Sequence, residues 1–142
     1  MRAAIASLAA LLLAAAPPPP ADGLTIAWEG LRSQKGRILI CVTRNAKHFP
    51  NCSDDPEKRH YDVAATAGIL PVGRLASGDY AIAIIHDENG NGKLDTFMGI
   101  PREGVGFSRN APIRFGPPGF RAASVPVADM PQRQTIRVKY FL

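Results

Sequence analysis

The densest group of residues that could do chemistry runs from Asp87 to Asp95 and reads Asp-Glu-Asn-Gly-Asn-Gly-Lys-Leu-Asp. Oxygen-bearing side chains stand at loop positions 1, 3, 5 and 9, with glycine at position 6, which is the spacing of an EF-hand-like calcium loop. Calcium prefers oxygen ligands, and the backbone carbonyl at position 7 supplies a further one. The predicted metal ligands are therefore Asp87, Asn89, Asn91, the carbonyl of Lys93, and Asp95.

The match to a calcium loop is incomplete. Position 12 is Met98, so the bidentate glutamate is absent, and no flanking helices are predicted. A turn rich in Asn and Gly explains the same residues without an ion, because both residue types accept positive φ at low cost. A weak calcium site and a simple turn both remain open at this point. The sequence requires no cofactor, and Ca²⁺ is the one candidate.

The sequence contains two cysteines, Cys41 and Cys52. In an oxidising compartment such a pair is most simply a disulfide, here closing a loop of about 12 residues and worth up to about 3 kcal/mol. Two free thiols, or a metal or redox pair, are the alternatives. The spacing is not C-x-x-C, and no histidine completes a recognised metal-binding spacing with the pair, so we predict the disulfide.

Catalytic signals are weak. The three histidines are His48, His60 and His86, and none has a recognised zinc-binding spacing. A hydrolase centred on His86 and Asp87 is the less favoured hypothesis, because no nucleophile motif accompanies them. A deep pocket joining His86 to Glu103 and Ser108 would support it. We expect a binding or structural protein rather than an enzyme.

The N-terminus has the pattern of a secretory signal peptide. Arg2 precedes an apolar run of residues 3–16, which is shorter than the roughly 20 residues that a bilayer requires and ends in small alanines. An uncleaved anchor is the alternative. We assign residues 1–21 to the signal peptide and residues 22–142 to one mature domain, and we expect that domain to be periplasmic or secreted. No later apolar run is long enough to span a membrane.

Charge gives little indication of a partner. The net charge of +5 falls by one when Arg2 is removed, and the basic residues are scattered along the chain. No nucleic-acid-binding motif accompanies them, so we expect no nucleic-acid partner. Weak attraction to anionic envelope polymers is the functional alternative to a set of solvated basic side chains.

Alternating apolar residues predict about seven short strands. Leu24–Glu29 has the period of a half-buried strand, whereas Arg37–Thr43 is apolar on both faces and should be central. Pro71 should lie at a sheet edge because it cannot donate to a ladder. The further predicted strands cover residues 61–66, 68–75, 80–86, 122–127 and 135–141.

Short strands separated by turns predict an all-β fold, an antiparallel β-sandwich with Greek-key connections, and a small barrel is the alternative. A long irregular loop follows the fifth strand, from Asp87 to Gly119. Loops of this length are usually functional or packed as an irregular lobe. We expect this region to bind an envelope or extracellular protein or a small ligand. A purely structural or interaction module without an ion is the alternative.

Three stretches carry a family resemblance: residues 77–83, 86–95 and 99–108, with Gly116-Pro117-Pro118 and the closing residues 136–140 following in order. Together they resemble the exported bacterial family of unknown function numbered 2141. The resemblance implies export and a transthyretin-like sandwich, and it transfers no catalytic residue. Transthyretin-like enzymes that hydrolyse 5-hydroxyisourate end in Tyr-Arg-Gly-Ser, whereas this chain ends Lys139-Tyr140-Phe141-Leu142, which argues against that activity.

Overall fold

The computed structural model describes residues 22–57 and 59–142, so the predicted signal peptide lies outside the described residues. Strands dominate this part of the chain. In chain order they are β1 (Leu24–Glu29), β2 (Arg37–Thr43), β3 (Arg59–Ala64), β4 (Ile69–Gly73), β5 (Gly78–Asp87), β6 (Thr96–Phe97), β7 (Ile100–Pro101), β8 (Gly104–Phe107), β9 (Val125–Val127) and β10 (Gln132–Arg137). Short helical turns are η1 (Ala46–His48), η2 (Ala65–Ala67), η3 (Ser108–Asn110) and α1 (Phe120–Ala123).

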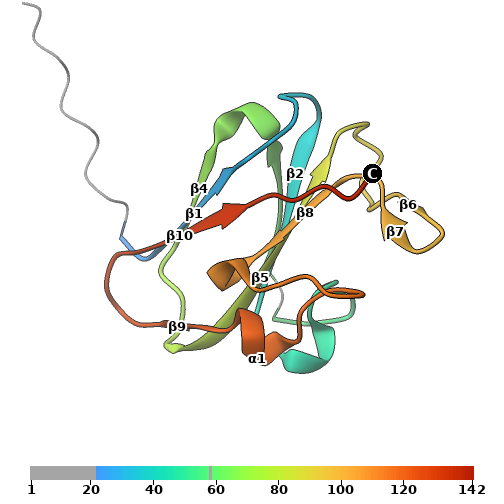
Figure 1. The fold of residues 1–142 in the computed structure, drawn as a ribbon. Helices are drawn as coiled ribbons and strands as arrows, with labels where there is room; N and C mark the ends of the chain where they lie inside the picture. The colour runs from blue at the N-terminus through green and yellow to red at the C-terminus, as the bar shows by residue number, and fades with distance from the viewer. Residues whose placement is uncertain (1–21, 58) are drawn as a thin grey trace, which may run out of the picture.

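The strands form two main sheets that face each other (Figure 1). The larger sheet has the order β3-β2-β5-β8, with β9 also pairing with β5, and the smaller sheet has the order β10-β1-β4. The hairpin β6–β7 stands apart from both. The predicted all-β sandwich is confirmed, and the described strands form no closed barrel. β4 is an edge strand, as Pro71 predicts.

The main hydrophobic core fills the space between the sheets. Ile40 and Ile84 contribute from the larger sheet, and Ile26 and Ile136 from the smaller one, each at most 1% exposed. β2 turns its alternate residues to opposite faces, so that Ile40 enters this core while Cys41 enters a second one. This two-sided burial explains why β2 is apolar throughout and why its predicted bounds are correct.

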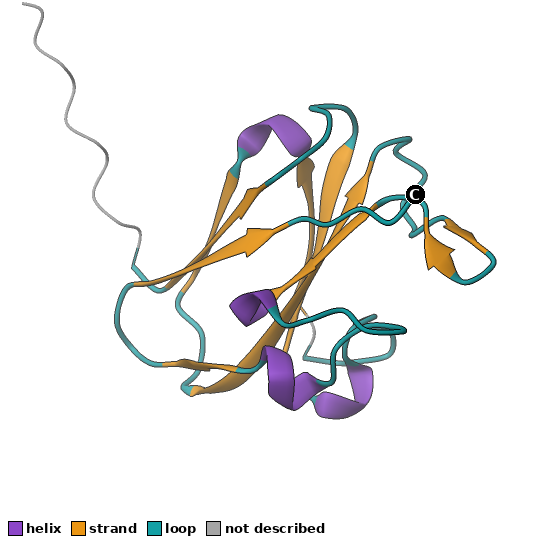
Figure 2. Cartoon of the chain, in the orientation of Figure 1, coloured by secondary structure: helices purple, strands orange, loops and turns teal. Residues whose placement is uncertain are grey.

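A second core covers the outer face of the larger sheet. Phe49 makes edge-to-face contacts with Phe107 and Phe120, at ring-centroid distances of 6.0 and 6.1 Å. Cys41 and Cys52 join in the predicted disulfide, with Cα atoms 5.8 Å apart. Figure 2 shows η1, η3 and α1 gathered on one side of the sheets. The C-terminal part of the predicted long loop therefore packs against the sheet.

Three sequence-based expectations need correction. Residues 122–127 were expected to form one strand, but the chain makes the single helical turn α1 before β9, because Ala123 is fully buried and its carbonyl accepts the Ser108 hydroxyl. The last strand begins earlier than expected and pairs in parallel with β1, placing Ile136 beside Trp28. The segment expected to be irregular contains β6, β7 and β8.

Glycines let the C-terminal segment cross β8 closely. Val105 and Lys139 exchange backbone hydrogen bonds of 2.9 and 2.8 Å. A Cβ atom on Gly104 would lie 2.6–2.7 Å from ring atoms of Tyr140, and one on Gly106 would lie 2.7 Å from a methyl group of Ile136. Both distances are shorter than van der Waals contact. The glycines therefore place Tyr140 against the end of β5. No helix among the described residues is long and apolar enough to cross a membrane.

Candidate functional site

The predicted calcium loop, residues 87–95 and here called the Asx loop, begins at the last residue of β5. Asp87 is fully buried. Its two carboxylate oxygens accept the backbone N–H groups of Asn91 (3.2 Å) and Gly92 (2.7 Å). The carboxylate therefore holds the loop in a tight turn, and the positive φ of Gly92 (80°) suits the glycine that the sequence places there.

The other predicted ligands meet at Asp95. The side-chain amides of Asn89 and Asn91 donate to its carboxylate at 2.7–3.0 Å, and these hydrogen bonds lower the pKa of Asp95. The amide oxygens of Asn89 and Asn91 accept backbone N–H groups two residues further on, the second of them from Lys93. Within the described residues, no three His, Cys, Asp or Glu side chains are arranged to hold a metal ion. The loop is thus closed by its own hydrogen bonds.

Glu103 adds an acidic group that the calcium-loop pattern does not include. It directly precedes Gly104, which pairs with His86 across β5 and β8, so Glu103 lies beside the Asx loop. It is 5% exposed, and its two oxygens accept the backbone N–H groups of Glu88 (3.2 Å) and Asp95 (3.1 Å). Burial raises the pKa of Glu103, and the negative charges of Asp87 and Asp95 raise it further. From the sequence, Glu103 is a candidate only for the hydrolase pocket.

Arg32 ties this end of the sandwich together. Its guanidinium donates to Glu88 (2.9 and 2.6 Å), to the carbonyl of Arg102 (2.9 Å) and to that of Leu142 (2.7 Å). It also lies 4.5 Å from the centre of the Tyr140 ring. The hydrogen bond from Arg32 is the main cause that lowers the pKa of Glu88. No sequence pattern indicates this network, because its members are separated by tens of residues.

The residues of the hydrolase hypothesis are not brought together. His86 is fully buried between the Tyr140 hydroxyl at Nδ1 and the Lys35 carbonyl at Nε2, both at 2.7 Å. Because a carbonyl only accepts, Nε2 carries a proton, and in the neutral imidazole Nδ1 then accepts from the Tyr140 hydroxyl. Ser108 instead bonds the backbone of Ile82 and Ala123. The imidazole is therefore held as a structural hydrogen-bonding group.

The surface hollows of the described residues also give no support to the hydrolase hypothesis. One of about 340 Å³ adjoins the Asx loop, and a second of similar volume lies at the other end of β5. Neither is lined by His86 or Ser108. The residues around the first are Glu88, Asn89, Asp95, Thr96, Arg102 and Glu103.

The hairpin β6–β7 presents an apolar tip, made of Phe97, Met98 and Ile100, which are 55%, 86% and 44% exposed. Figure 1 shows the hairpin projecting at the end of the molecule where the chain terminates. Phe97 pairs with Ile100, so Met98 and Gly99 form a two-residue loop, and both have positive φ (50° and 78°). Large side chains rarely adopt this backbone conformation.

Comparison with known proteins identifies the family. A family model described as an uncharacterized protein conserved in bacteria, DUF2141, matches residues 26–135. The chain belongs to this family. No curated protein and no solved structure matches the chain.

The DUF2141 match covers most of the features of the candidate site. The Asx loop, the apolar tip and Glu103 all lie within the matched residues, whereas Tyr140 and the C-terminus lie beyond them. The predicted region of residues 87–119 divides in two. The hairpin β6–β7 projects from the sandwich, whereas Leu94 and the segment around Ala111 pack against the larger sheet.

Proposed function

We propose that this protein is an exported binding module, and that residues 88–103 form the surface that recognises a protein partner in the envelope or outside the cell. The observation that carries the proposal is Met98, which is 86% exposed in a left-handed backbone conformation. The evidence for export is the N-terminal signal-peptide pattern, together with a cysteine pair suited to an oxidising compartment.

The fold does not account for Met98. A two-residue hairpin loop with two positive φ angles favours Asn-Gly, because Asn tolerates this conformation and Met does not. Met98 gains no burial in exchange, and two further apolar side chains, Phe97 and Ile100, lie beside it. Exposed apolar groups of this kind mark interaction sites, and the flexible thioether of methionine adapts well to partner surfaces.

The support beneath the tip favours binding. Arg32 and Glu103 fix the segments on either side of the hairpin through hydrogen bonds to backbone groups. A surface that is already ordered loses less conformational entropy on association. The tip is therefore a small apolar contact on a rigid polar base.

Site-specific photocrosslinking in the native host tests this proposal. A photoreactive residue at Met98 should give an adduct of one discrete mass in the envelope fraction. The matched control is the same residue at Met130, which is 63% exposed and lies in the turn before β10. With the photoreactive residue moved to Phe97, Met98→Asn should weaken the adduct while leaving the fold at least as stable. An absent adduct, or an equal one from position 130, would refute the proposal.

Export is tested separately, by mass spectrometry of envelope protein. We expect a mature chain that begins between residues 16 and 24. Recovery of the full-length chain from the cytoplasm alone would contradict export and leave the binding proposal to be judged by crosslinking.

Calcium binding by the Asx loop is a second proposed function, and Glu103 favours it. This buried carboxylate is a third acid near Asp87 and Asp95, where the calcium-loop pattern lacks its glutamate at position 98. The three acids do not surround a metal position in the structure, so a bound cation would have to draw their oxygens closer together. Each carboxylate oxygen of Asp87 and Glu103 accepts one N–H and so keeps a further lone pair for a ligand. A divalent cation would also reduce the repulsion among the three acids.

The calcium proposal predicts weak binding, with a dissociation constant of about 10⁻⁴–10⁻³ M. At about 100 times that constant, Ca²⁺ should add about 2.7 kcal/mol to the free energy of unfolding, relative to EDTA. Mg²⁺ should bind less well, because it demands near-octahedral geometry. Asp87→Ala and Glu103→Gln should abolish or reduce the gain, whereas Asp129→Asn, a change at an exposed acid away from the loop, should not. Unchanged melting temperature and loop NMR resonances would show that the loop is only a turn.

A further inference from the structure

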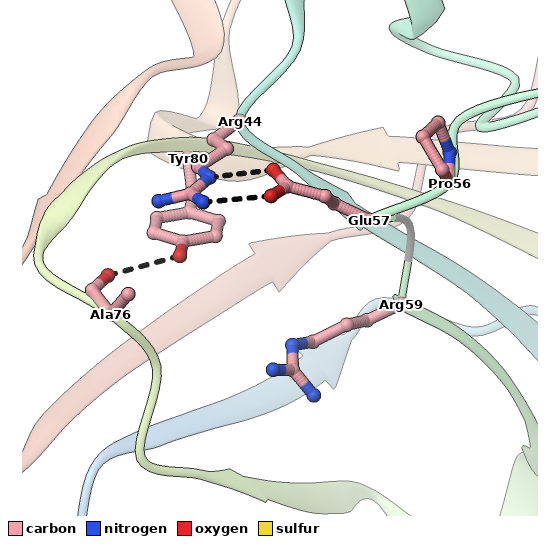
Figure 3. A pocket seen from close by; sticks show the side chains of 6 residues that line it. All are labelled: Arg44, Pro56, Glu57, Arg59, Ala76 and Tyr80. Atoms are coloured by element: carbon pink, nitrogen blue, oxygen red, sulfur yellow. Dashed lines mark hydrogen bonds and ion pairs between the residues drawn. The ribbon is translucent and has the colours of Figure 1, made fainter.

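The second hollow lies at the opposite end of β5 from the Asx loop and has a volume of about 340 Å³, which is within the range of small-ligand sites. Arg44 directly follows β2, Glu57 and Arg59 flank the start of β3, and Tyr80 lies near the start of β5 (Figure 3). Pro56 and Ala76 complete the lining. Among the described residues, the charged side chains that face the hollow are the two guanidinium groups and the one carboxylate.

Most polar groups of this hollow already have partners within the protein. Arg44 binds Glu57 through two parallel hydrogen bonds of 2.9 and 3.0 Å. The Tyr80 hydroxyl donates to the Ala76 carbonyl at 2.9 Å. The hydrogen bond from Arg44 lowers the pKa of Glu57, so the carboxylate stays ionised at neutral pH.

The wall that holds Glu57 is itself fixed from behind. Asp55 is 4% exposed, and its carboxylate accepts the Glu57 backbone N–H (2.9 Å) and the Thr43 hydroxyl. The disulfide between Cys41 and Cys52 joins the same segment to β2. The backbone of residues 55–57 is therefore held in place beside the hollow.

Arg59 is the exception among the charged side chains here. Its guanidinium makes no hydrogen bond or ion pair with any described residue, and Figure 3 shows it apart from the Arg44–Glu57 pair. A guanidinium offers a planar fork of donors that matches the two oxygens of a carboxylate. The described lining residues carry one net positive charge, which suits a single negative charge on a ligand.

We infer that this hollow binds the carboxylate of a ligand, with Arg59 as the group that contacts it and the Arg44–Glu57 pair as the opposing wall. The carboxylate belongs either to a free small acid or to the C-terminus of a peptide. Glu57 disfavours dianions such as phosphate at neutral pH, because a second negative charge on the ligand would lie close to its own.

NMR titration of the mature chain at low ionic strength tests the inference and separates the two sources. The probes are acetate, an acetylated dipeptide with a free C-terminus, the same dipeptide amidated, and inorganic phosphate. We expect saturable shifts of the Tyr80 amide and the Arg59 Nε–H signals with both carboxylates and not with the amidated peptide. Tighter binding of the free dipeptide than of acetate would indicate a peptide source, and equal binding would indicate a small acid.

Variants supply the decisive comparison. Arg59→Gln should weaken carboxylate binding about ten- to a hundredfold, the usual effect of removing a hydrogen bond to a charged group. Arg133→Gln is the matched control, since Arg133 is an exposed arginine on β10 that forms no ion pair with any described residue. Glu57→Gln should tighten carboxylate binding and admit phosphate, because it removes the negative charge and frees Arg44.

Three results would each overturn the inference. The absence of saturable shifts with both carboxylates would overturn the inference, as would Arg59→Gln binding as tightly as the unaltered chain. Equal or stronger binding of phosphate by the unaltered chain would show that the hollow attracts anions without selecting carboxylates, which also overturns it. All three variants change exposed residues, so their unfolding free energies should stay within about 0.5 kcal/mol of the parent, with Glu57→Gln closest to that limit.

Discussion

Gly104→Ala tests the packing that connects the C-terminal segment to the candidate site. The added methyl group would lie 2.6–2.7 Å from ring atoms of Tyr140 and still closer to a methyl group of Val138, against about 3.5–4.0 Å for ordinary contact, so the ring and the Val138 side chain must both move by about 1 Å. The same movement would lengthen the 2.7 Å hydrogen bond between Tyr140 and buried His86 beyond bonding distance. The substitution therefore combines overpacking with the loss of a partner for a buried imidazole.

The expected loss of unfolding free energy is about 2–6 kcal/mol, the sum of about 1–3 for overpacking and about 1–3 for an unsatisfied buried polar group. Urea denaturation with the disulfide intact measures it. Gly78→Ala is the control, because a Cβ there would meet its closest neighbour, in Tyr80, at an ordinary 3.8 Å. That change should be neutral or stabilise by up to about 1 kcal/mol. A loss below about 0.5 kcal/mol for Gly104→Ala would refute the close approach of Tyr140.

Three further predictions concern other parts of the fold. Cys41→Ser with Cys52→Ser should lower the unfolding free energy by up to about 3 kcal/mol, and non-reducing peptide mapping of the parent should recover the linked peptide. Tyr140→Phe should cost about 1–3 kcal/mol in urea unfolding, because His86 loses its donor, whereas an unchanged midpoint would contradict that bond. Glu103 has a raised pKa when folded, so its protonated form favours folding at low pH, and this contribution is lost as pH rises through the folded pKa. In EDTA, Glu103→Gln should therefore become more stable relative to the parent as pH increases, and a pH-independent difference would count against the raised pKa.

Some strands can be predicted from the sequence because their hydrophobic pattern matches their burial in the folded protein. β2 is apolar on both faces and is buried on both, so its predicted and observed bounds coincide. Pro71 marks an edge strand, which β4 is. β8 is not readable, since Gly104 and Gly106 resemble a loop until the crossing segment that requires them is known. α1 likewise depends on the burial of Ala123, which no local period shows.

In the candidate site, too, features that depend on neighbouring residues can be predicted from the sequence, whereas features that depend on distant residues cannot. The Asx loop is local, so its hydrogen-bonded turn can be anticipated from residues 87–95 alone, although the sequence leaves its affinity for calcium open. Arg32 and Tyr140 reach that end of the sandwich from distant parts of the chain. The positions of these two side chains depend on strand register and on how the C-terminal segment crosses β8. Hydrophobic periodicity specifies neither.

The two proposed sites occupy opposite ends of β5, and their chemistry differs in a way that makes the tests independent. One end offers exposed apolar side chains, whose contact with a partner should depend little on salt. The other offers a guanidinium in a polar hollow, whose attraction for a carboxylate should weaken as ionic strength rises. Failure at one end leaves the other proposal intact.

If a single partner occupied both ends, it would have to span the length of β5, about 30 Å for its ten residues. Loss of crosslinking at Met98 on Arg59→Gln substitution would then reveal one extended ligand in place of two separate ones.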